Sequence, residues 1–232
     1  MDLCRAALAS GAFTICLGSV AEAATSLDFG QGVPHPSICT GGVGGVGSAA
    51  LCANGLSILQ SYGDVPGVVD VSYSAPRAST GTNPVGLNWW SSGYNNLYGV
   101  LFATGSDANS LARIELRVLQ LGQMLNVRHL DLGAFPSTTR ETDVTITDLT
   151  TGTVLKSFNN FMAGNQQSNT ASSFDFTDVS STTGIRIEFA DTALNVGIDN
   201  ITYDIAPIPE PGTYALMLTG LGLVGCAVRR RT

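Results

Sequence analysis

The chain has few charged residues. Of its 232 residues, 12% are charged, about half the fraction of roughly 25% in an average soluble domain. It contains a single lysine, Lys156, and its formal net charge is −7. The one basic cluster is Arg229, Arg230 and Arg231 near the C-terminus. Because binding to phosphates requires clustered lysine and arginine, we do not expect the protein to bind nucleic acid.

The chain also lacks the common catalytic motifs. It has two histidines, His35 and His129, and neither a G-x-S-x-G nor an H-E-x-x-H pattern. Gly42–Gly47 fits G-x-G-x-x-G, but no apolar strand precedes it, so we interpret it as a flexible loop. No spacing among the acidic residues selects a pair for glycoside hydrolysis. We therefore predict a protein that is not an enzyme, with a secreted hydrolase as the less favoured alternative.

The N-terminus has the pattern of a secretory signal peptide. Arg5 precedes an apolar run from Ala6 to Val20, and Ala21-Glu22-Ala23 supplies the small-x-small pattern that signal peptidase cleaves. We predict a signal peptide over residues 1–23, with cleavage after Ala23. The alternative is a buried N-terminal helix, which the Ala-Glu-Ala ending does not favour.

The C-terminus has the pattern of a membrane segment. Pro211–Val228 comprises 18 residues, about 27 Å as a helix, against a hydrocarbon core of roughly 30 Å. Thr219 is its one polar residue after Ala215, whereas a soluble helix would show a polar face. The arginines that follow indicate a cytoplasmic end. We predict a transmembrane helix here; the alternative is a buried C-terminal helix of the domain.

The order of elements in this tail carries a resemblance. Pro209-Glu210-Pro211, an apolar stretch with Gly-Leu-Gly-Leu, and the cluster Arg229-Arg230-Arg231 follow one another. This tail, residues 207–232, resembles the PEP-CTERM sorting signal of Gram-negative bacteria, which is also labelled an ice-binding-protein C-terminal domain. The resemblance implies an inner-membrane precursor that an exosortase cleaves near Pro-Glu-Pro. It also implies release to the cell surface or the exopolysaccharide matrix.

The positions of the cysteines are consistent with an exported protein. Of the five cysteines, Cys4 and Cys16 lie in the predicted signal peptide and Cys226 in the predicted membrane segment. Cys39 and Cys52 remain, and in an oxidising compartment we expect them to pair, contributing about 3 kcal/mol to stability. The alternative is two free thiols.

Residues 24–206 contain alternating patterns typical of strands. In Ile185–Phe189, Arg186 and Glu188 alternate with apolar residues. Thr142–Phe158 has the pattern of a hairpin that turns at Asp148–Gly152. The other expected strands are Ser26–Gly30, Val68–Ser74, Leu97–Ala103, Leu111–Leu121 (with a short helix as the alternative), Asn126–Phe135, Ser173–Phe176 and Val196–Ile205. We predict one all-β domain, an antiparallel β-sandwich.

The segment Val196–Ile205, VGIDNITYDI, is similar to the last strand of jelly-roll carbohydrate-binding modules. The resemblance implies a jelly-roll-like sandwich and a structural calcium ion bound by Asp199. Asp28, in the first expected strand, is the candidate second ligand, and backbone carbonyls would supply further oxygens. By alternation Asp199 shares a side with Ile201 and Tyr203, where an unpaired carboxylate is costly. The alternative is a bulge at Asp199-Asn200 that turns the carboxylate to solvent.

Aromatic residues cluster among amides in Asn88–Gly99, NWWSSGYNNLYG. Trp89, Trp90 and Tyr94, with Tyr98 beside them, are candidates for stacking against sugars. The favoured alternative is that one tryptophan fills the core and the other caps a loop. Together these patterns predict an exported, non-catalytic protein with a structural or adhesive role at the cell surface or in the exopolysaccharide matrix. The alternative is a carbohydrate-binding module.

Overall fold

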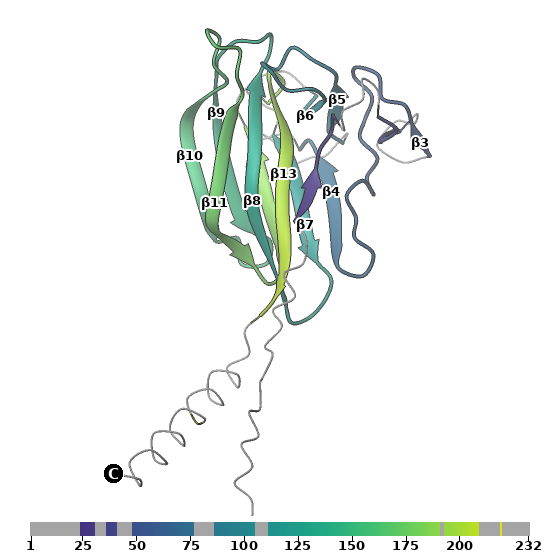
Figure 1. Ribbon diagram of the computed structural model, residues 1–232, viewed down its shortest axis with the longest axis vertical. Coiled ribbons are helices and arrows are strands. Elements are labelled where there is room, and N and C mark those ends of the chain that lie inside the picture. The colour runs from purple at the N-terminus through teal and green to yellow at the C-terminus, as the bar shows by residue number, and fades with distance from the viewer. Residues whose placement is uncertain are drawn as a thin grey trace, which may run out of the picture.

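The computed structural model describes residues 24–30, 36–40, 48–76, 86–104, 111–190, 193–208 and 219. Two antiparallel sheets lie face to face (Figure 1). One has six strands: β1 (Thr25–Leu27), β5 (Asn88–Trp90), β6 (Val100–Phe102), β8 (Gln123–Ala134), β11 (Ser172–Ser181) and β13 (Val196–Pro207). The other has five: β4 (Val69–Ser74), β7 (Ala112–Val118), β9 (Arg140–Asp148), β10 (Val154–Ala163) and β12 (Gly184–Phe189). The predicted all-β antiparallel sandwich is confirmed, and it is consistent with a jelly-roll-like arrangement.

The order of strands differs from the order along the chain. The six-stranded sheet runs β11-β8-β13-β6-β5, with β1 added to β13, and the five-stranded sheet runs β10-β9-β12-β7-β4. The first strand therefore pairs with the last, Thr25 lying opposite Tyr203. A small separate sheet pairs β2 (Cys39–Thr40) with β3 (Ala49–Ala50). The sequence patterns did not predict β2, β3 or β5, which are too short to show alternation.

Alternation explains how the sheets bury their inner faces. In β12, Ile185, Ile187 and Phe189 are buried and belong to the core, while the two charged residues between them face outward. Arg186 lies opposite Glu115 of β7, and its Nε donates to that carboxylate at 2.8 Å. The predicted strand is confirmed. The ambiguous segment Leu111–Leu121 contains strand β7 over Ala112–Val118 rather than a helix, and its last residues belong to the turn before β8.

The predicted hairpin is also confirmed. β9 and β10 pair antiparallel, and the connecting turn is held by Asp148. Its Oδ1 accepts hydrogen bonds from the backbone N–H groups of Thr150 at 3.0 Å and Thr151 at 2.8 Å. The carboxylate thus accepts hydrogen bonds from N–H groups of the turn, in place of the strand-to-strand hydrogen bonds that end there.

Candidate functional site

A polar hollow opens on the outer face of the six-stranded sheet. Its volume is about 310 Å³, at the lower end of the range of roughly 300–1,000 Å³ found for small-molecule sites. Five separate stretches of the chain meet there. The lining residues are Asp28, Gly30, Asn96, Leu97, Tyr98, Asp131, Ala171, Ser173, Asp199 and Asn200. Carboxylates, amides, a hydroxyl group and one phenol ring therefore surround one space.

A bulge in β13 places Asp199 in this hollow. Val196 and Ile198 belong to the core, and so do Ile201 and Tyr203, so the alternation reverses between the two pairs. Asn200, with φ of 54°, lies at the reversal, where the pairing with β8 shifts register. A bulge of one residue moves every preceding side chain to the opposite face. The prediction that Asp199 shares the side of Ile201 and Tyr203 is therefore wrong, because that alternation does not continue through Asn200.

Asp199 nevertheless stays buried, with 3% of its surface exposed. The bulge was the expected alternative, but it does not turn the carboxylate to solvent. Its Oδ1 accepts a hydrogen bond from the backbone N–H of Phe29 at 2.9 Å. Burial is the main cause that raises the pKa of Asp199 to about 8, and the nearby Asp28 and Asp131 carboxylates add to the rise.

Asp131 is the lining carboxylate that the sequence patterns did not single out. It lies in β8 directly opposite Asp199. Its Oδ1 accepts a hydrogen bond from Ser173 Oγ at 2.5 Å, and its Oδ2 accepts one from Asn200 Nδ2 at 2.8 Å. The alternation of Asp131 between Leu130 and Leu132 predicts its outward orientation, but only the pairing of β8 with β13 brings it to Asp199.

His129 borders the same group of side chains and is half-buried. Its Nε2 lies 3.2 Å from Asp131 Oδ1, and its Nδ1 lies 2.8 Å from Asp175 Oδ1. Partial burial acts to lower the pKa of His129, but the hydrogen bond with Asp175 and the charge of Asp131 outweigh it and raise the pKa. The arrangement favours a positively charged imidazole between two carboxylates.

Tyr98 provides an open aromatic surface in the hollow. It is 70% exposed, the one aromatic side chain exposed to this degree among the residues that the structure describes. The loop that carries it crosses the Asp28–Gly30 loop very closely. A Cβ on Gly30 would lie 1.8 Å from the carbonyl oxygen of Tyr98, and Gly99 has φ of 74°. These two glycines allow the crossing that places Tyr98 beside the carboxylates.

The predicted stacking residues lie elsewhere. Trp89 is 1% exposed and Tyr94 is 2% exposed, so neither ring has a free face for a sugar, and both predictions are wrong. Trp90 is half-buried and packs edge-on against Phe102 and Phe135, each with ring centroids 6.0 Å away. The alternative that one tryptophan fills the core is confirmed for Trp89.

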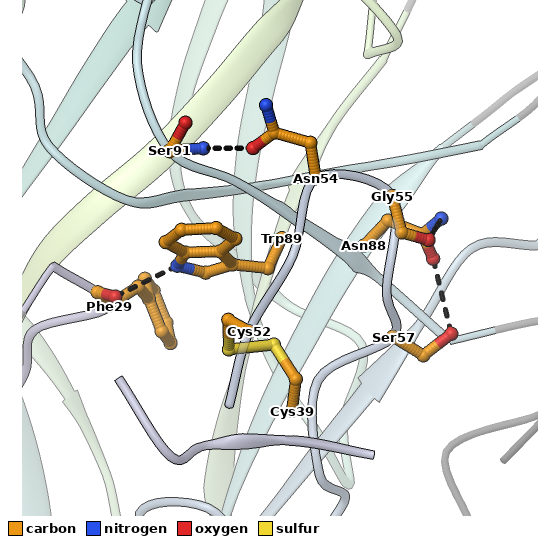
Figure 2. Close-up of a disulfide and its surroundings, with 9 residues drawn as sticks. All are labelled: Phe29, Cys39, Cys52, Asn54, Gly55, Ser57, Asn88, Trp89 and Ser91. Atoms are coloured by element: carbon orange, nitrogen blue, oxygen red, sulfur yellow. Dashed lines mark hydrogen bonds between the residues drawn. A yellow bond between two sulfur atoms is a disulfide. The ribbon is translucent and has the colours of Figure 1, made fainter. Parts of the chain in front are cut away.

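Trp89 holds in place a loop that lines the hollow. Its indole N–H donates a hydrogen bond to the carbonyl oxygen of Phe29 at 2.9 Å (Figure 2), which fixes the loop between Asp28 and Gly30.

The predicted disulfide is also present, joining Cys39 and Cys52 with 5.0 Å between their Cα atoms. The chain after Cys52 pairs with β5, because Gly55 N donates to Trp89 O and Trp89 N donates to Leu56 O.

The calcium prediction involves Asp28 and Asp199, which both line the hollow. The pairing of β1 with β13 brings the chain segments that carry these two residues together. In the described ranges, however, no three His, Cys, Asp or Glu side chains form a group that could hold a metal ion. The hydrogen bond from the Phe29 amide and the pKa of about 8, which keeps the carboxyl group protonated at neutral pH, allow Asp199 to be buried without a metal ion. A calcium ion therefore stays a prediction that rests on the jelly-roll resemblance.

The two targeting segments, residues 1–23 and 207–232, lie outside the described residues apart from Pro207, Ile208 and Thr219. The sorting residues outside the described part are Pro209, Glu210, Pro211, Arg229, Arg230 and Arg231. His35 and Gly42–Gly47 also lie outside it. Within the described part, no helix is both long enough and apolar enough to cross a membrane.

Comparison with known families identifies the C-terminal tail. Residues 207–231 match the PEP-CTERM protein-sorting motif. The chain carries a PEP-CTERM sorting signal. The motif implies an exported protein that passes through the membrane and is processed by an exosortase.

Among curated proteins, the chain has no match. One similar solved structure is a family 29 carbohydrate-binding module, CBM29_1, from Piromyces equi. It is 16% identical, with 61% of this chain and 92% of that chain covered and a TM-score of 0.27. A likeness this weak supports no conclusion about the ligand.

Proposed function

We propose that the protein is a non-catalytic component of the cell surface or exopolysaccharide matrix of a Gram-negative bacterium. An exosortase processes it, and its β-sandwich contacts polysaccharide through the hollow around Tyr98. The PEP-CTERM motif at residues 207–231 supports the sorting. The observation that carries the contact with polysaccharide is the open Tyr98 ring beside carboxylates and amides in one hollow.

The chemistry of the lining suits a sugar. A pyranose presents an apolar face of C–H groups and a rim of hydroxyl groups, which donate and accept hydrogen bonds. Tyr98 offers a flat apolar surface with a polar tip. Asn96, Asn200 and Asp131 offer amide and carboxylate groups around it. Small-molecule sites commonly combine an aromatic surface with a few placed polar groups in this way.

The contacts of the carboxylates favour binding over hydrolysis. A glycosidase needs one carboxylic acid and one carboxylate facing the same bond. Asp131 already accepts hydrogen bonds at both oxygens, from Ser173 and Asn200. Asp199 is protonated at neutral pH, but it is only 3% exposed and accepts from the Phe29 amide, so its carboxyl group does not face a bound sugar as a glycosidase acid would.

The sorting is tested by expressing the full chain in a host with an exosortase and in the same host without it. Intact-mass spectrometry is then applied to the membrane and extracellular fractions. We expect a product that begins near Ala24, ends near Pro209–Pro211 and leaves the cell only when the exosortase is present. An uncut chain that stays in the membrane in both strains contradicts the proposal.

The contact with polysaccharide is tested on the processed protein by affinity electrophoresis through gels containing the host exopolysaccharide. Tyr98→Ala should weaken binding about three- to tenfold, since an aromatic contact contributes roughly 0.5–1.5 kcal/mol. Tyr98→Phe keeps the ring and should retain most of the affinity. Met162→Ala, an exposed position on β10 in the other sheet, is the matched control. Equal retardation of Tyr98→Ala and the wild type would exclude the hollow.

A further inference from the structure

The turn between β7 and β8 presents two leucines to solvent. Leu119 is 51% exposed and Leu121 is 98% exposed, the largest value among the apolar side chains that the structure describes as exposed. No charged residue occurs from Val118 to Val127. The exposed surface of these leucines does not help the sandwich to fold, because it adds no buried apolar area to the domain. They therefore require another explanation.

This turn is tied to the end of the domain from which the tail departs. β13 pairs with β8 to its last residues, Pro207 lying opposite Gln123. Beyond the strand, the backbone N–H of Ile208 donates to the carbonyl oxygen of Gly122 at 2.8 Å. Figure 1 shows the β7–β8 turn beside the end of β13, both at the lower end of the sandwich. The last hydrogen-bonded residue before the Pro-Glu-Pro motif thus contacts the turn directly.

The spacing brings the turn to the membrane surface. The apolar run begins at Pro211, three residues after Ile208, and three extended residues span at most about 11 Å. The polar layer on each side of a bilayer is roughly 5–8 Å thick. When the apolar run lies in the hydrocarbon core, Ile208 and the turn bonded to it lie at most about 11 Å from that core, which is inside the polar layer or just beyond its outer edge.

We propose that the β7–β8 turn is a membrane-contact loop of the precursor. Leu119 and Leu121 enter the polar layer of the periplasmic leaflet of the inner membrane, and the uncharged turn carries no ion that must lose its hydration. The occupant is the lipid surface, and the inference rests on the proposed membrane-held precursor. Two leucines bind lipid only weakly, so cleavage of the tail also releases the turn.

The contact would orient the sandwich. Asp199, in the hollow, lies eight residues before Pro207 along β13, roughly 26 Å at about 3.3 Å per residue. A turn held at the lipid surface therefore directs the hollow away from the membrane while the Pro-Glu-Pro motif is kept against it. The motif would meet a membrane-embedded exosortase in one position rather than at the end of a freely rotating domain.

The test uses the full-length chain with its tail, reconstituted into vesicles of phosphatidylethanolamine and phosphatidylglycerol. In Leu121→Trp, lipids brominated at a shallow acyl position should quench the introduced indole at least twofold, after subtraction of the wild-type signal. Met162→Trp is the matched control: it is also exposed, at 52%, and lies near the distal end of β10, so no quenching is expected. In the exosortase-cleaved product, the quenching of Leu121→Trp should disappear.

The outcomes separate this inference from the proposal on which it rests. A wild-type chain that fails to float with the vesicles refutes the membrane-held precursor and the contact loop together. A chain that floats, but whose Leu121→Trp indole is quenched no more than that of Met162→Trp, refutes only the contact loop. If Leu121→Ser then slows cleavage in an exosortase-containing host, the turn contacts the enzyme instead of lipid.

Discussion

The buried carboxyl group of Asp199 should make the stability of the protein depend on pH. Its pKa is raised to about 8 in the folded state, from an ordinary value of 3.8, mainly by burial. The folded protein therefore binds one more proton than the unfolded chain between these two pH values. Stability falls with rising pH wherever the folded state holds the extra proton.

The expected effect is large. The free energy of unfolding should fall by about 1.4 kcal/mol for each pH unit between pH 4 and pH 8, about 5 kcal/mol in all. Asp199→Asn removes the ionisation and keeps an oxygen that accepts from the Phe29 amide. The variant should therefore lack this fall and be more stable than the wild type at pH 8, by several kcal/mol.

Urea denaturation of the processed wild type and Asp199→Asn, from pH 4 to pH 8 with calcium chelated, measures the difference between them. That difference removes the contributions of titrating groups that are distant from Asp199. Parallel curves for the two proteins would refute the reasoning, because they would mean that Asp199 is ionised when folded at no cost. If added calcium abolishes the fall in the wild type but leaves Asp199→Asn unchanged, the calcium prediction is supported.

Two further predictions concern stability away from the hollow. The cysteines of the disulfide are 13 residues apart, so replacing Cys39 and Cys52 together by alanine should lower the free energy of unfolding by about 3 kcal/mol. In calorimetry this corresponds to a melting temperature roughly 6–12 °C lower, and an unchanged value would show that the loop closure contributes nothing. For Asp148, partial burial acts to raise the pKa, but hydrogen bonds from Ser181 and Thr151 prevail and lower it to about 2. The stability that the Asp148 carboxylate contributes is present above pH 4 and is lost as the pH falls through 2. At pH 7, the free energy of unfolding of Asp148→Asn should therefore be about 1 kcal/mol lower than that of the wild type. Most of the difference should vanish in urea titrations near pH 2, and a difference independent of pH would contradict the assignment.

Local patterns predicted most of the strands, because the alternation of a half-buried strand repeats within a few residues. In β12, the sequence alone shows which residues face the core. It does not show that Arg186 meets Glu115 or that Glu188 meets Arg113, because those partners are set by the pairing of β12 with β7. Strands β2, β3 and β5 escaped prediction because two or three residues show no period, whereas β1 overlaps the longer predicted stretch Ser26–Gly30 and β6 lies within Leu97–Ala103.

Asp199 shows where alternation fails. Counting by two from Ile205 back to Asp199 assigns the carboxylate to the core side, but the left-handed backbone at Asn200 reverses the count. Asparagine tolerates this conformation, yet most asparagines in strands and loops do not adopt it. The sequence therefore allowed the bulge as an alternative and could not select it.

The tail and the export pattern were determined by the sequence alone, because a sorting signal is recognised as a linear order of residues, Pro-Glu-Pro, apolar run and arginines. The alternation of the strands and the pairing of Cys39 with Cys52 were likewise predictable from local spacing and compartment. Only the tertiary structure decided which aromatic ring is open: Trp89 is buried and Tyr98 is exposed, although both lie in one polar stretch. It also formed the hollow, since Asp28, Asp131 and Asp199 become neighbours through the pairing of strands far apart in the chain. Such pairing depends on how whole faces bury one another, which no short stretch of sequence encodes.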